Sequence, residues 1–231
     1  MVGMRGSYVI FAILFATVAL HAAEERVLSG TTSPNKEIVV VEVLAADGQS
    51  DFYFVDRLSG KRLGFVLPRE QRRQISKVGI VAKWNKSSTR VAMMVYYGTK
   101  LSELLIHSRG RDGAFHEVEL EAPDPLELYQ KRTGKRIASQ GDGYSDNSVG
   151  PWLDEDTVLL MSGEAKQVIP PGSETEDVDL GQYAHVYATF RAKIRGRTAR
   201  VSDLRLIGPL TNKESGTFKK QWEARYLSGG D

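Results

Sequence analysis

Hydrophobic and polar positions alternate in short runs along most of this chain. From residue 37 onward, apolar stretches are separated by turn signals rich in Gly, Asp, Ser and Asn, a spacing that is typical of antiparallel strands. In residues 51–58 both the odd and the even positions carry apolar side chains, which predicts an interior strand rather than one with a solvated face. We expect strands at residues 38–44, 51–58, 62–67, 79–84, 90–97, 101–107, 114–120, 152–161, 183–194 and 198–207.

One short helix is expected between these strands, at residues 125–133. Asp124 can cap its N-terminus, Pro125 suits its first position, and Gly134 can end it. Polar and basic residues near its C-terminal end suit the helix dipole.

A second helix is expected near the C-terminus. Phe218, Trp222 and Tyr226 recur at four-residue spacing, which predicts an amphipathic helix that packs onto the sheet. Together the elements predict an all-β fold with two helices. The strands form an antiparallel meander, arranged either as a sandwich or as a degenerate, propeller-like domain.

The first 23 residues differ from the rest because they are almost uncharged. Arg5 is the only charged side chain before Glu24, and residues 8–20 are apolar apart from Thr17. This pattern, followed by small residues, is that of a secretory signal peptide. An uncleaved N-terminal anchor is the alternative, although the run is at the short end of the about 20 residues that a membrane span needs. We therefore expect an exported protein, periplasmic or extracellular, or one anchored by its N-terminus.

After this leader we expect a polar linker at 24–36, one β domain at 37–210 and a tail at 211–231. A chain of this length can bury a sizeable core. The absence of cysteine excludes disulfides and thiolate metal sites. Because 31 basic residues nearly balance 29 acidic ones, no overall field favours nucleic acid. No segment after the leader has the length and apolarity that would predict a membrane span.

Two tryptophan segments of the chain are similar to each other. Residues 84–92 and 152–160 each contain a tryptophan, a short polar turn and an apolar strand. Together with the Ser-Gly-Lys turn at 59–61, they resemble the blades of TolB-like β-propellers over about residues 38–165. The tryptophans are 68 positions apart, whereas propeller repeats span about 40–50 residues. The resemblance implies a platform that binds a ligand or a protein, more than a catalyst.

The most regular alternation lies in residues 183–194. One face is apolar, whereas Tyr187, Arg191 and Lys193 share the other face and Arg195 extends it. Arg and Lys beside a tyrosine can bind a phosphate, a carboxylate or an acidic glycan. A solvated face whose charges prevent aggregation is the alternative. These four side chains are the candidate ligand-binding residues, and an anionic glycan or an envelope protein is the candidate partner.

Two long loops are acidic. The loop at 140–150 contains Asp142 and Asp146, and the loop at 170–181 contains an acidic run at 174–179. Neither has the ligand spacing of an EF-hand, so solubilising loops are favoured over a calcium site. Long loops in compact domains are often functional, so an exported hydrolase that uses these acids is an alternative function.

Catalytic motifs are absent from the sequence. It has no Gly-x-Ser-x-Gly elbow, His-Glu-x-x-His motif, Walker loop or dinucleotide fingerprint. His107 and His116 flank one expected hairpin and could approach each other, but two surface histidines are the simpler interpretation. Asn85 begins a glycosylation sequon. We expect no catalytic residue, metal or cofactor, and favour a non-catalytic binding or structural β module of the cell envelope over the hydrolase.

Overall fold

The computed structural model describes residues 24–44, 50–67, 78–135, 137, 143–167 and 183–226. The expected leader, Asp142 and the acidic loop at 170–181 lie outside these residues. Within them the chain forms thirteen strands and two helices, which confirms the all-β prediction.

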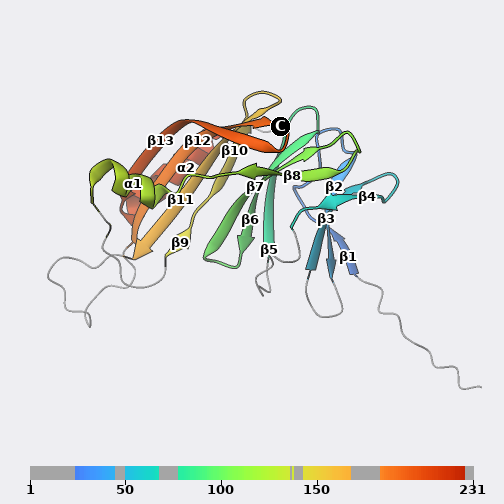
Figure 1. The fold of residues 1–231 in the computed structure, drawn as a ribbon. Coiled ribbons are helices and arrows are strands. Elements are labelled where there is room, and N and C mark those ends of the chain that lie inside the picture. Colours follow the sequence, from blue (N-terminus) through green and yellow to red (C-terminus); the bar gives the residue numbers. More distant parts are fainter. Residues whose placement is uncertain are drawn as a thin grey trace, which may run out of the picture.

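The strands form three consecutive units, each a four-stranded antiparallel meander (Figure 1). The first unit contains β1 (Glu24–Val27), β2 (Ile38–Leu44), β3 (Ser50–Asp56) and β4 (Arg62–Phe65). The second contains β5 (Val78–Trp84), β6 (Arg90–Tyr97), β7 (Leu101–Arg109) and β8 (Phe115–Leu120). The third contains β10 (Ser148–Trp152), β11 (Thr157–Gln167), β12 (Tyr183–Arg195) and β13 (Thr198–Leu210). The short β9 (Tyr144–Ser145) pairs with β11.

The second and third units are joined through a short parallel ladder between β8 and β13. It pairs Glu119 with Thr198 and Leu120 with Ala199. The two units thereby form one nine-stranded sheet, whereas the first unit is a separate four-stranded sheet. The sequence predicted an antiparallel meander, and this parallel ladder is the exception to it.

The central position of β6 explains why both of its faces are apolar. Val91, Met93 and Val95 pack into a core shared with the first unit. Ala92 and Met94 point the other way, into a core shared with the third unit. Full burial of a large apolar side chain contributes about 1.5–3 kcal/mol, so these two cores hold the three layers together. In the first unit, β3 likewise buries apolar side chains on both faces, as the sequence predicted.

The helix α1 (Pro125–Thr133) has the predicted bounds. The Asp124 carboxylate accepts the backbone N–H groups of Leu126 and Glu127 at 2.8 and 2.9 Å. Gly134 ends the helix in the left-handed region, with φ of 68°, which glycine adopts without a steric penalty. The helix packs against β11, β12 and β13.

The helix α2 (Asn212–Tyr226) confirms the expected C-terminal helix. It begins with a capping box, in which the Thr211 N–H donates to Glu214 Oε2 at 2.9 Å and the Glu214 N–H donates to Thr211 Oγ1 at 3.3 Å. Trp222 and Phe218 pack against Tyr187 of β12. Residues 212–226 of the expected tail are therefore part of the folded domain.

Three expected boundaries differ from the structure. The expected linker at 24–36 contains β1, whose side chains are all exposed and therefore lack an apolar pattern. The expected loop at 140–151 contains β9 and most of β10. A bend at 153–156 divides the expected strand at 152–161 between β10 and β11. Pairing with β2 and with β11 sets the first two boundaries, whereas the third is the local turn of the β10–β11 hairpin.

Candidate ligand-binding cleft

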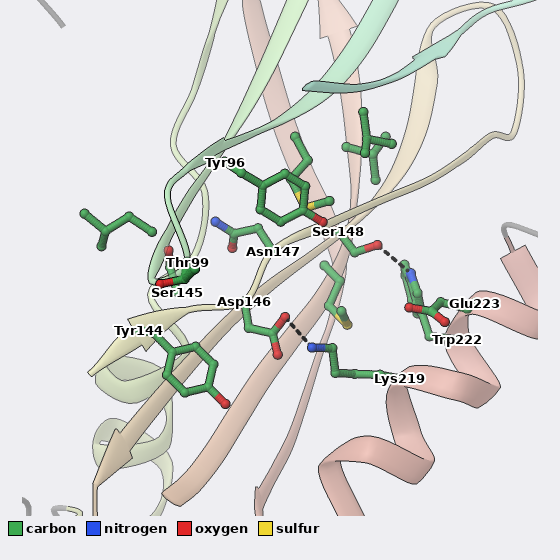
Figure 2. A pocket seen from close by; sticks show the side chains of 15 residues that line it. Tyr96, Thr99, Tyr144, Ser145, Asp146, Asn147, Ser148, Lys219, Trp222 and Glu223 are labelled. Atoms are coloured by element: carbon green, nitrogen blue, oxygen red, sulfur yellow. Dashed lines mark hydrogen bonds and ion pairs between the residues drawn. The ribbon is translucent and has the colours of Figure 1, made fainter. Parts of the chain in front are cut away.

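A cleft of about 310 Å³ opens between the second unit, the third unit and α2 (Figure 2). Tyr96 of β6 forms part of one wall, and residues 144–149 form another. Lys219, Trp222 and Glu223 of α2 complete it. Because its walls come from three separate parts of the chain, the cleft exists only in the assembled fold.

The Asp146 carboxylate lies inside the cleft with both oxygens engaged. Its Oδ1 lies 2.8 Å from Lys219 Nζ, and its Oδ2 accepts the Tyr187 hydroxyl at 2.9 Å. Burial above all raises the pKa of Tyr187, so this phenol stays protonated and remains a donor. A carboxylate held by two charge-assisted bonds fixes the helix to the sheet and is poorly placed to transfer a proton.

Further polar contacts hold α2 against the strands. The Trp222 indole N–H donates to Ser148 Oγ at 3.1 Å, and Ser215 Oγ lies 2.7 Å from the Tyr187 hydroxyl oxygen. Ser215, Trp222 and Tyr187 are all buried. The helix is therefore fixed in position by hydrogen bonds as well as by apolar packing.

The segment that enters the cleft also ties the second unit to the third. The Asn147 side-chain amide donates to the Ser102 carbonyl at 2.7 Å, and its oxygen accepts the Gly163 N–H at 3.2 Å. The Ser145 hydroxyl donates to the same Ser102 carbonyl at 3.0 Å. These groups maintain the shape of the cleft, and their hydrogen-bonding capacity is largely used within the protein.

Two tyrosines line the cleft on different sides of Asp146 (Figure 2). The Tyr96 side chain is 40% exposed, and Tyr144 is half-buried with its hydroxyl 3.4 Å from His185 Nδ1. Burial, followed by the charge of Asp146, raises the pKa of both phenols. Both hydroxyls therefore stay neutral, and the two rings offer an apolar surface with a polar edge.

The predicted basic face is divided by the structure. Arg191, Lys193 and Arg195 are exposed along β12, and Arg191 Nη1 lies 3.0 Å from Asp203 Oδ2. Tyr187 does not join them, because α2 covers it and leaves it 0% exposed. The structure therefore keeps the three basic residues together and removes the tyrosine from the accessible face.

The two histidines of the β7–β8 hairpin do not meet. His107 pairs in register with Glu117, next to His116, so the two histidine side chains point to opposite faces. His107 is buried in the core, and His116 lies 3.0 Å from Asp112 Oδ2 near the surface. The simpler interpretation is thus correct for His116 and wrong for His107.

Two further findings concern the described part of the chain. Within it, no group of three or more His, Asp or Glu residues could hold a metal ion. None of the helices in these ranges has the length and apolarity needed to cross a membrane.

Comparisons with protein-family models, curated proteins and solved structures found no match for this chain. The resemblance to TolB-like propellers therefore stays a hypothesis that depends on the sequence pattern alone.

Sequence reasoning missed most of the cleft because its residues are distant along the chain. Asp146 was recognised only as an acid in a loop, and Lys219 was not singled out. One available signal was the Thr-x-x-Glu pattern at 211–214, which marks the start of a helix. It would have predicted where α2 begins, but not which strands it covers.

Proposed function

We propose that this protein is an exported, non-catalytic binding module of the cell envelope that takes a glycan in the cleft. The observation that carries this proposal is the accessible Tyr96–Tyr144 pair in a cleft whose only described aspartate, Asp146, is already held by Lys219 and Tyr187. Glu223 also lines the cleft, but with Asp146 engaged the site offers more for binding than for proton transfer.

The chemistry of the walls favours a sugar ring as the ligand. A sugar presents apolar C–H faces that pack on tyrosine rings and hydroxyls that exchange hydrogen bonds with tyrosine edges. Lys219 Nζ has three N–H donors and pairs with Asp146 among the described residues, so it can also meet a carboxylate on an acidic sugar. The exposed Arg191, Lys193 and Arg195 supply a second basic contact for an anionic glycan or for an envelope protein.

A glycan array with the purified full chain tests the cleft. Replacing both Tyr96 and Tyr144 by alanine is expected to weaken binding about tenfold or more, because two stacking contacts are lost. Tyr129→Ala, on α1, is the matched control and should bind as the wild type does. Equal binding by the double variant and the wild type would remove the cleft from consideration.

The three exposed basic residues of β12, Arg191, Lys193 and Arg195, are tested separately. Arg191→Glu combined with Lys193→Glu reverses two charges on β12 and is expected to abolish binding of an anionic glycan to that face. Unchanged binding would exclude these basic residues as the glycan-binding site. The hydrolase alternative is addressed with a panel of esters, glycosides and phosphate esters, for which we expect no turnover.

We propose export on the basis of the N-terminal sequence alone. Fractionation of producing cells should place the protein outside the cytosol, and intact mass should match loss of about 23 residues, as signal peptidase cleavage requires. Retention of the full mass in a membrane fraction would instead support the anchor. An intact chain free in the cytosol would refute both.

The order of the strands supports a relationship to propeller blades. Each unit is a four-stranded antiparallel meander packed face to face with the next, as blades are. Trp84 ends the first strand of the second unit and Trp152 ends the first strand of the third. We propose that the units are degenerate blades arranged without a closed ring.

A further inference from the structure

A second pocket, with lining residues different from those of the cleft, lies where two hairpin turns meet. It has a volume of about 560 Å³ and is lined by the β7–β8 turn and by Arg197 of the β12–β13 turn. Arg90, Arg109 and Arg111 also line it, as does His116. Four guanidinium groups therefore border one cavity.

The acidic residues nearby neutralise only part of this charge. Arg90 Nη1 lies 2.7 Å from Asp156 Oδ1, and Asp112 is held by His116 at 3.0 Å. Arg109 Nε donates to the Gly113 carbonyl at 3.1 Å, a contact that leaves its positive charge uncompensated.

Within the described ranges, three of the arginines thus have no carboxylate as a close partner. Among the described residues, no ion pair within 4.0 Å involves Arg109, Arg111 or Arg197. Asp112 also lines the pocket, and Arg109 acts on a further carboxylate at longer range: hydrogen bonds from Ser59 above all, and more weakly the charge of Arg109, lower the pKa of Asp56. Like charges that face one cavity repel each other, and an anion in the cavity would relieve this repulsion.

We propose that this pocket binds a phosphate group. Guanidinium groups hold phosphate oxygens through paired N–H donors and keep their charge at any ordinary pH. A cavity of about 560 Å³ is larger than one phosphate ion requires, so a phosphomonoester such as a sugar phosphate also fits. The near balance of charge over the whole chain favours such a local site over a nucleic acid, which requires an extended basic surface.

Calorimetric titration of the full chain with inorganic phosphate at low ionic strength tests the site. We expect saturable binding that weakens at least tenfold when Arg111 and Arg197 are both replaced by glutamine. Both side chains are exposed in turns, so circular dichroism should show an unchanged fold. Arg132→Gln, an exposed arginine on α1, is the matched control and should bind as the wild type does.

The source of the phosphate is distinguished by a parallel titration with glucose 6-phosphate. Tighter binding than that of inorganic phosphate supports a phosphorylated sugar as the ligand, and equal binding supports the free ion. Absence of saturable binding, or an equal loss in the Arg132→Gln control, would overturn the proposal. The variant with Tyr96 and Tyr144 replaced by alanine should keep full phosphate binding, so failure at this pocket and failure at the cleft can be told apart.

Discussion

The indole Nε1 of Trp152 donates a hydrogen bond of 2.7 Å to the backbone carbonyl of Lys83. This bond joins the first strand of the third unit to the first strand of the second. Trp84 makes a similar contact one unit earlier, where its Nε1 donates to the carbonyl of Thr31, between β1 and β2, at 3.0 Å. The similarity of the two tryptophan segments in the sequence therefore corresponds to a shared structural role.

Trp152→Phe is expected to lower the free energy of unfolding by about 1–3 kcal/mol, because the Lys83 carbonyl loses its partner while the ring is largely retained. Urea denaturation monitored by circular dichroism measures the change. Leu153→Ala is the control, because its side chain is 46% exposed and should have little effect. Equal stability of Trp152→Phe and the wild type would mean that the indole contact contributes nothing.

Gly163 lies in β11 where no side chain fits. A Cβ atom there would lie 2.3 Å from the Asp146 carbonyl oxygen and 2.6 Å from the Tyr187 ring. Gly163→Ala should therefore destabilise the fold by about 1–3 kcal/mol, the usual cost of overpacking.

Gly216 is the matched control for this glycine. A Cβ there meets nothing within 4 Å, and the residue lies inside α2. Gly216→Ala should raise stability by roughly 0.5–1 kcal/mol, because alanine has the higher helix propensity. Thermal melts of both variants should therefore shift in opposite directions, and shifts of the same sign would contradict the packing described for α2 and β11.

His107 makes stability depend on pH. Burial, followed by the charge of His116, lowers the pKa of this imidazole from 6.5 to about 3. The unfolded chain therefore binds the proton more tightly. The contribution of the neutral His107 to stability is fully present above pH 6.5. It is lost as the pH drops toward 3, and the folding equilibrium constant falls by about tenfold per pH unit.

His107→Leu should remove this part of the acid sensitivity. Denaturation at a series of pH values from 8 to 4 should give a shallower dependence than in the wild type. The comparison at pH 8 separates the packing cost of the substitution, since the wild-type imidazole is neutral there in both states. Parallel curves for the two proteins would show that His107 is not a buried neutral group.

Asn85 begins a glycosylation sequon but is 0% exposed. Its amide nitrogen donates to Glu155 Oε2 at 2.8 Å, and its oxygen accepts the Arg90 N–H at 2.9 Å. Mass spectrometry after secretion from a glycosylating host should find Asn85 unmodified. Asn85→Ala should cost at least about 2 kcal/mol, because several buried partners lose their bonds, whereas Lys86→Ala at the exposed neighbouring position should be nearly neutral.

Local patterns predicted local structure well. The Asp124 cap, Pro125 and Gly134 define α1 at its observed bounds, and the strands expected at 38–44 and 90–97 match β2 and β6. These features were accessible because each depends on residues within one or two turns or on a period of two.

Features that depend on distant partners could not be predicted. Nothing near Tyr187 in the sequence indicates that α2 covers it, so the residue was placed on an accessible face with Arg191. The parallel ladder between β8 and β13 joins segments about 80 positions apart, and no local rule specifies such a pairing. The Asp146–Lys219 ion pair is likewise set by how the layers assemble.

The layers follow one another along the chain, and synthesis delivers them in that order. When β8 has emerged, the face of the second unit that bears Ala92, Met94 and Ile106 still has no cover. About 75 residues must follow before Ile194 completes that core, which takes on the order of 4–15 seconds at typical elongation rates. A nascent chain of this protein therefore passes through a period in which this apolar face is exposed to water. A holding chaperone would act most usefully during that period.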